Sequence, residues 1–266
     1  MEIVKVKLDV IFKKIFADKE NEDILHCFLA DMMQIPKESI TSIVLEDPGL
    51  LPDDMSGKFS RMDLRLTVND ELVNVELQVK PEPNYRDRSL YYWSRMYTSD
   101  LKSGEGYGKL KRSIALNIIN FNLFDTPAYC SEFGLYEKNR RELLTDKLSI
   151  CFFELRKLGK TVDAGDARQQ WLQFINSESE EELGMVEKNT DRSELKKAVM
   201  IVREMSADER TREIARLREK ALHDEANALG AAREEGKAAE RERAIAYMRM
   251  LGISQEQIDH YRSASI

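Results

Sequence analysis

Two runs of alternating apolar and polar residues dominate the pattern of residues 59–80. This period of two is typical of strands with one buried face. The Asn69-Asp70 pair between the two runs favours a tight turn, so the pattern predicts a β-hairpin in which Val68 faces Glu71. The alternating apolar residues are Leu64, Leu66 and Val68 in the first run and Val73, Val75, Leu77 and Val79 in the second.

Counting outward from this turn places Asp63 opposite Glu76, with Gln78 further along on the same face. Opposed residues of a hairpin have Cβ atoms about 4.5–5.5 Å apart, and two like charges at that distance destabilise a sheet. A divalent cation would offset the repulsion, because Mg²⁺ prefers one or two carboxylates together with waters and phosphate oxygens. The alternative is that both acids are ordinary solvated residues on an open sheet face.

Helical and extended patterns follow one another over the first 160 residues. Apolar residues at helical spacing predict three helices. Asp9 is expected to cap the first of them, and the alternative is that it is a third acidic residue near the metal. The nearly continuous apolar run of residues 114–121 indicates a buried central strand. Together the elements predict an α/β fold with a mixed sheet flanked by helices. The helices are expected at residues 8–17, 22–34 and 86–101, and further strands at 40–45, 132–136 and 148–155.

The composition changes after residue 160, where no further strand is expected. We therefore predict a core over residues 1–160 and an all-α C-terminal extension over 161–266. Charged helices over 191–250 would be solvated or pair through a narrow seam, a basis for homodimerisation, and 252–266 would form a short docking motif. Helices are expected near 166–176, 193–205, 207–229, 232–251 and 255–261, with capping boxes that begin at Asp191, Ser206 and Ser254 and breaks at Gly230 and Gly236.

The net charge of −7 does not by itself indicate a nucleic-acid-binding protein. The charge is uneven, however, because residues 161–266 carry 17 Lys/Arg and 22 Asp/Glu, which leaves 24 and 26 for residues 1–160. The predicted core is nearly neutral, and local basic patches can still bind phosphate. The chain has no signal-peptide pattern, no run of 18 apolar residues and three cysteines without metal-ligand spacing. These features predict a cytoplasmic protein without a membrane span.

Basic and aromatic residues gather in the helix predicted at 86–101. Arg88 and Arg95 are seven residues apart and share one helix face, on which they could contact phosphates. Lys109, at the C-terminal end of the glycine-rich loop 104–109, and Arg112, just after it, make this part of the chain basic. That loop lacks the spacing of a phosphate-binding loop, so we interpret it as a helix-to-strand connection. The aromatic residues could stack on unpaired bases, but packing is the simpler role for Leu90, Trp93 and Tyr97.

Six segments, in order and spacing, resemble the Rpn family of recombination-promoting nucleases, also described as transposases, within the PD-(D/E)XK nuclease superfamily. The superfamily signature is an Asp on one strand and Glu-x-Lys on the next. In this chain Glu76-x-Gln78 stands where the signature has Glu-x-Lys, and the Rpn-like branch is similar in using Glu-x-Gln. The segments are LDVIFKKIF (8–16), GKFSRMDL (57–64), VNVELQ (73–78), YRDRSLYYWSRMY (85–97), GEGYGKLKRSIALNIINF (104–121) and LSICFFELRK (148–157).

The resemblance implies a restriction-endonuclease-like fold and a DNA endonuclease that depends on Mg²⁺, with Mn²⁺ as the alternative ion. Asp63 and Glu76 would bind the ion together with the Leu77 carbonyl. Gln78 would orient the attacking water, and Lys80 would either supply the missing positive charge or be a surface lysine at the strand end. Two alternatives remain open, namely hydrolysis of RNA and a catalytically weak or silent DNA-binding or assembly protein. The residues expected to hold DNA are Arg88, Arg95, Lys109 and Arg112.

Overall fold

A computed structural model of the chain describes residues 2–46 and 64–264. By packing, the chain forms two compact units, Met1–Arg216 and Leu217–Ile266. Asp63 lies outside the described residues, so its role stays a prediction. The functional boundary expected at residue 160 also stays a prediction, because the compact units report packing and not function.

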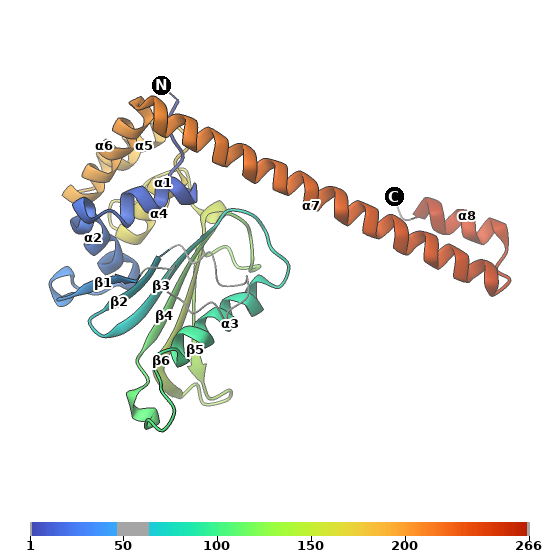
Figure 1. Cartoon of the computed structure of the whole chain (residues 1–266), viewed down its shortest axis with the longest axis horizontal. Coiled ribbons are helices and arrows are strands. Elements are labelled where there is room, and N and C mark those ends of the chain that lie inside the picture. The colour runs from blue at the N-terminus through green and yellow to red at the C-terminus, as the bar shows by residue number, and fades with distance from the viewer. Residues whose placement is uncertain (1, 47–63, 265–266) are drawn as a thin grey trace. The chain divides into compact units, whose positions relative to one another are not determined.

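The first unit is built on a six-stranded sheet with the strand order β1-β2-β3-β4-β6-β5 (Figure 1). Strands β3, β4 and β6 are parallel to one another, whereas the other neighbours are antiparallel. The sheet is therefore mixed, and the predicted α/β fold is confirmed. The strands are β1 (Ile43–Glu46), β2 (Leu64–Val68), β3 (Glu71–Gln78), β4 (Ser113–Ile119), β5 (Cys130–Tyr136) and β6 (Leu143–Glu154).

The β2–β3 hairpin has the register that its sequence predicts, with Val68 opposite Glu71 and Leu64 opposite Val75. Asn69 and Asp70 have φ values of 48° and 68°. Positive φ at both central residues is typical of the type I′ turn, whose twist matches that of the flanking strands. The predicted hairpin is thus confirmed from Leu64 to Val75.

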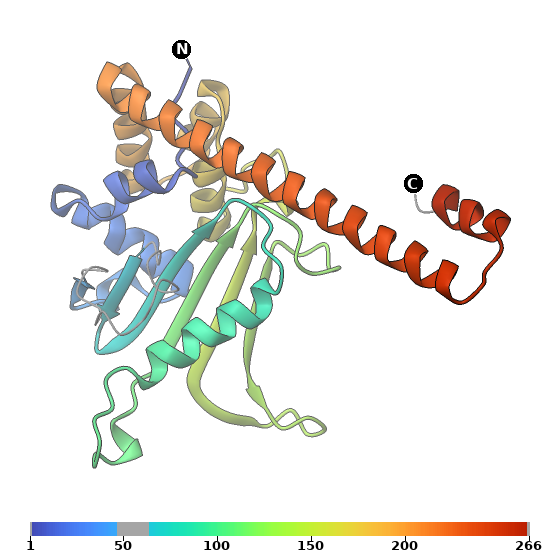
Figure 2. The same ribbon diagram turned by 45° about the vertical axis from the view of Figure 1, so that its right-hand side comes forward.

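Helix α3 (Tyr85–Thr98) lies along one face of the sheet (Figures 1 and 2). Trp93 anchors it there, with the indole N–H donating to the Ser113 carbonyl at 2.8 Å. Leu90 is 52% exposed, so its predicted packing role is wrong, whereas that of Trp93 is confirmed. The buried cluster between the helix and the sheet includes two residues of α3, Tyr85 and Met96, and four strand residues, Leu72, Ala115, Ile150 and Phe152.

The opposite face of the sheet is covered as well. Arg168 of α4 lies over the ring of Phe153, which alternates with Phe152 and so points away from α3. In the helices of this region, the aromatic rings of Phe16, Phe28 and Trp171 pack against one another. Side chains on both faces of the central strands are therefore covered by helices. The helices of this region are α1 (Asp9–Phe16), α2 (Glu22–Met33), α4 (Ala167–Asn176), α5 (Glu180–Asn189) and α6 (Ser193–Ala207).

Several predicted helix caps are corrected by the structure. Asp9 is the first residue of α1 and follows the cap position, which Leu8 occupies. Arg192 takes the place expected for Asp191 before α6. Ser206 lies inside α6, where its hydroxyl donates to the Val202 carbonyl. Asp208 caps the next helix instead, accepting from the Thr211 N–H at 2.7 Å.

Helix α7 (Glu209–Met250) begins in the first unit and continues through the second without interruption. The breaks predicted at Gly230 and Gly236 are therefore wrong. Glycine in a helix costs about 1 kcal/mol relative to alanine, and the neighbouring Ala, Glu, Lys and Arg residues are strong helix formers. None of the described helices is both long and apolar enough to cross a membrane.

The second unit ends in a short helix, α8 (Gln255–Ala264), that follows a glycine turn. Gly252 has a φ of +76°, a conformation that favours glycine at the end of a helix. The predicted cap of α8 is confirmed, since the Ser254 hydroxyl accepts from the Gln257 N–H at 3.4 Å. Ile245 of α7 and Ile258 of α8 are both buried.

Candidate functional site

Glu76 is a buried acid in the second half of β3. It is 3% exposed and pairs with Asn117 of the parallel strand β4. Its side of the sheet is the one that α3 covers, because Leu72 and Phe152 of the same alternation contact that helix. The interpretation of Glu76 as an ordinary solvated residue is therefore wrong.

Arg88 of α3 supplies a positive charge to this acid. One guanidinium N–H group lies 3.2 Å from a Glu76 carboxylate oxygen, and the guanidinium carbon is 5.1 Å from the centre of the Tyr92 ring. Burial lowers the pKa of Arg88, but the hydrogen bond to Glu82 and the charge of Glu76 outweigh it, so the net pKa is raised. Arg88 thus offsets much of the free-energy cost of burying Glu76 as an anion.

Glu82 joins Arg88 to Gln78. Its Oε2 atom accepts from Arg88, and its Oε1 atom accepts from the Gln78 amide at 2.9 Å. The same amide nitrogen donates to the Lys80 carbonyl at 3.0 Å. We call Glu76, Gln78, Glu82 and Arg88 the carboxylate–arginine cluster.

Sequence reasoning found three members of this cluster and missed Glu82. Glu82 lies in the loop between β3 and α3, where neither a strand nor a helix period marks it. The one local signal is the pair of prolines that flanks it, Pro81 and Pro83. Its role is set by contacts with Gln78 and Arg88, which only the fold reveals.

Asn117 fixes the rotation of α3 above the cluster. Its side-chain oxygen accepts from the Tyr85 hydroxyl at 3.3 Å and from the Ser89 hydroxyl at 2.8 Å, while its nitrogen donates to the Cys151 carbonyl at 3.1 Å. Tyr85 and Ser89 are four residues apart and share one helix face. Arg88 lies between them in sequence, so the same contacts hold it over Glu76.

The other predicted DNA-binding residues lie outside this cluster. Arg95 is exposed on α3, and Lys109 forms an ion pair with Glu105 at 2.6 Å. Arg112 forms an ion pair with Glu71 at 3.3 Å, at the beginning of β3. Because a strand rises about 3.3 Å per residue, Arg112 is roughly 20 Å from Gln78 along the strand. Their role in DNA binding stays a prediction.

The described members of the cluster have donor chemistry that suits a hard divalent cation. A carboxylate and an amide oxygen are ligands that Mg²⁺ accepts, and Glu76 and Gln78 provide them two residues apart on one face. Within residues 2–46 and 64–264 there is no group of three or more His, Cys, Asp or Glu residues that could hold a metal ion. Asp63, the second predicted carboxylate, lies outside those residues.

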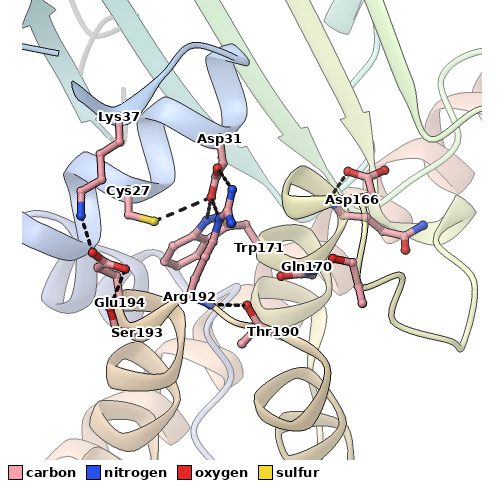
Figure 3. A network of polar contacts seen from close by, with 12 residues as sticks. Cys27, Asp31, Lys37, Asp166, Gln170, Trp171, Thr190, Arg192, Ser193 and Glu194 are labelled. Atoms are coloured by element: carbon pink, nitrogen blue, oxygen red, sulfur yellow. Dashed lines mark hydrogen bonds and ion pairs between the residues drawn. The ribbon is translucent and has the colours of Figure 1, made fainter. Parts of the chain in front are cut away.

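A second polar network connects three helices in the first unit (Figure 3). Asp31 of α2 accepts from the Trp171 indole of α4 at 2.8 Å and takes two guanidinium hydrogen bonds from Arg192, which precedes α6. The Cys27 Sγ atom lies 3.7 Å from Oδ2 of the same carboxylate. Burial, and after it the charge of Asp31, raises the pKa of the Cys27 thiol to about 12. Both oxygens of the Asp31 carboxylate thus accept hydrogen bonds, which connects the helices and indicates a structural role.

Comparison with known proteins gave one family. The model of the PD-(D/E)XK nuclease family transposase matches residues 6–232, which include the whole sheet and the carboxylate–arginine cluster. No curated protein matches the chain significantly. No solved structure does so either.

Proposed function

We propose, because this chain belongs to the PD-(D/E)XK nuclease family transposases, that it is a metal-dependent endonuclease that hydrolyses phosphodiester bonds in DNA. The observation that carries the proposal is Glu76, a nearly fully buried acid that meets the Arg88 guanidinium at 3.2 Å. The pKa of Arg88 is perturbed, and groups with perturbed pKa values cluster at functional sites. Glu76 is also the acid at the position that matches the family signature.

In the proposed reaction, Glu76 holds Mg²⁺ or Mn²⁺ together with Asp63 and the Leu77 carbonyl. When bound, such an ion polarises the phosphate and makes a water molecule more acidic. Gln78 orients the attacking water, with Lys80 at the strand end as a further charge. Preorganised charge next to the developing negative charge is the main source of rate enhancement in this scheme.

Arg88 is the cation best placed to meet the substrate phosphate in this proposal. It is half-buried and partly desolvated, which strengthens its interaction with an anion. Arg95, Lys109 and Arg112 would hold more distant parts of the DNA backbone through phosphate contacts. Such contacts position the duplex without reading its sequence, so this proposal predicts little sequence preference from them.

The test is cleavage of supercoiled plasmid by the purified protein with Mg²⁺ or Mn²⁺. Wild type should nick the plasmid, while Asp63→Ala and Glu76→Ala should not. Equal residual cutting by all three proteins would indicate contamination and overturn the proposal. A protein that retards DNA on a gel yet cuts no faster than its variants would support the alternative of a silent DNA-binding protein. RNA of the same sequence, tested in parallel, identifies the polymer.

Ion binding is tested separately from turnover. Crystals soaked in Mn²⁺ should show anomalous density beside the Glu76 carboxylate. The Glu76→Ala variant, soaked in the same way, should show none. Density elsewhere in the wild type and none beside Glu76 would contradict the proposed ion site.

A further inference from the structure

The amide of Gln78 is held in one orientation. A glutamine amide has two N–H donors and one acceptor oxygen. Both donors are engaged, one with the Lys80 carbonyl at 3.0 Å and one with the Glu82 carboxylate at 2.9 Å. The atom that this amide can still offer to a bound group is therefore its Oε1 oxygen.

Glu82 holds Arg88 with its other oxygen. Oε2 of Glu82 accepts from one guanidinium nitrogen of Arg88, and another guanidinium nitrogen of Arg88 contacts Glu76 at 3.2 Å. A single carboxylate thus fixes two side chains of the cluster at once. Charge-assisted hydrogen bonds of this kind are about twice as strong as neutral ones, so both partners are well restrained.

The backbone on both sides of Glu82 is restricted. Pro81 and Pro83 each have a fixed φ and lack an N–H group. Asn84 follows with a φ of 58°, and α3 begins at the next residue. The position of the Glu82 carboxylate is therefore set by a loop with few accessible conformations.

We propose that Glu82 is a positioning residue of the candidate site, which holds the Gln78 amide oxygen and the Arg88 guanidinium ready for the group that binds at Glu76. This inference rests on the proposed nuclease function. The superfamily signature has a lysine at the position of Gln78, and we infer that two residues of this chain share the role of that lysine. Gln78 supplies an oxygen that can accept a hydrogen bond from water or bind an ion, and Arg88 supplies the positive charge.

The first experiment compares Glu82→Ala with a matched control, Glu187→Ala. Both acids bind an arginine, and their side chains are 35% and 34% exposed. Residues that orient ligands in this way typically contribute 10- to 100-fold to activity or metal affinity. Glu82→Ala should lower plasmid cleavage by about that factor and weaken Mn²⁺ binding in calorimetry, whereas Glu187→Ala should change neither. Wild-type cleavage and Mn²⁺ affinity in Glu82→Ala would overturn the proposal.

A mutant cycle with three substitutions separates positioning from a general structural effect. Glu82→Ala should have little further effect, less than about threefold, in a protein that already carries Gln78→Ala and Arg88→Ala, because its two partners are gone. A structural role would lower the rate by the same factor in both backgrounds. An equal factor in both backgrounds would therefore contradict the proposal. Glu82→Gln should lie between wild type and Glu82→Ala, because its amide can still accept from Gln78 but cannot accept as a carboxylate from Arg88.

A third readout does not depend on cleavage. The side-chain amide signal of Gln78 in a ¹⁵N-correlated NMR spectrum can be assigned by its loss in Gln78→Ala. It should shift in Glu82→Ala and stay unchanged in Glu187→Ala. An unshifted signal in Glu82→Ala overturns the positioning role even in an active enzyme. A shifted signal in a protein that cuts no nucleic acid would instead refute the nuclease function and leave the contact between Glu82 and Gln78 standing.

Discussion

Two arginine-bound acids of the first unit differ in how the arginine is shared. The Arg192 guanidinium gives two hydrogen bonds to one acid, Asp31. Arg88 instead divides its donors between Glu76 and Glu82. The first arrangement is a closed pair with balanced charge, whereas the second places one positive charge between two negative ones.

The difference shows what each region is suited for. A bidentate pair that also takes the Trp171 indole connects α2, α4 and α6 and has little capacity for a further ligand. A shared guanidinium leaves a net negative charge, which a bound cation can compensate. Asp31 should therefore matter for folding and Glu76 for chemistry.

The largest expected effect is the loss of activity in Glu76→Gln. The substitution keeps the shape of the side chain but removes the charge that would hold the ion, which is worth several kcal/mol of transition-state stabilisation. Plasmid cleavage should fall by at least about 10³-fold, since each 1.36 kcal/mol is tenfold in rate. The free energy of unfolding in urea should change by less than about 1 kcal/mol, because Arg88 keeps its ion pair with Glu82. Undiminished cleavage would remove Glu76 from the site.

Asp31→Ala should show the opposite behaviour. It leaves the Trp171 N–H and the Arg192 guanidinium without their acceptor. Breaking a buried pair of this kind lowers the free energy of unfolding by about 3–5 kcal/mol. We expect about 3 kcal/mol, the low end of this range, because Arg192 is 37% exposed. Urea unfolding measures this loss. Cleavage per folded molecule should stay within about threefold of wild type. A stable Asp31→Ala variant with impaired cleavage would reverse the comparison.

A pH dependence separates a third pair, Lys37 and Glu194, from the others. The hydrogen bond from Lys37 lowers the pKa of Glu194 from 4.5 to about 2. The stabilisation is therefore complete above pH 4.5 and is lost as the pH falls toward 2. Lys37 is 40% exposed, so we expect only about 1 kcal/mol. Urea unfolding of wild type and Glu194→Gln should differ by this amount at neutral pH, and the difference should shrink in acid; a difference that does not change with pH would refute the assignment.

The smallest effect is expected for Glu187→Gln. Glu187 binds Arg203 at 2.8 Å, but each side chain is about one-third exposed. Pairs of this kind contribute roughly 0–1 kcal/mol. Thermal unfolding should place the variant within about 0.5 kcal/mol of wild type. A larger loss would show that exposure is a poor guide to the ranking of these ion pairs.

Local patterns predicted the elements whose signal is contained in their own residues. The period of two and the Asn69-Asp70 turn set the hairpin register, and the apolar run around Ile118 identified the buried strand β4. Capping spacing was a weaker guide, because several neighbouring residues can satisfy the same pattern. Asp208 therefore caps α7 where the spacing had indicated Ser206.

Features that depend on distant partners were not predictable from the sequence. Glu82 belongs to the cluster only because α3 folds back over β3 and brings Arg88 to it. Helix α5 escaped prediction, since it has only two buried apolar residues, Leu183 and Val186. The same reasoning explains Leu90, whose exposure depends on how α3 is rotated on the sheet.

The amide of Asn117 has a consequence for motion in this part of the molecule. It ties two successive turns of α3 to β4 and reaches β6 with its nitrogen. A helix anchored at both turns cannot roll or slide without giving up several hydrogen bonds. Adaptation to an incoming phosphodiester must then come from torsional jumps of individual side chains. In exposed side chains such jumps take picoseconds to nanoseconds, far faster than the collective motion of packed elements.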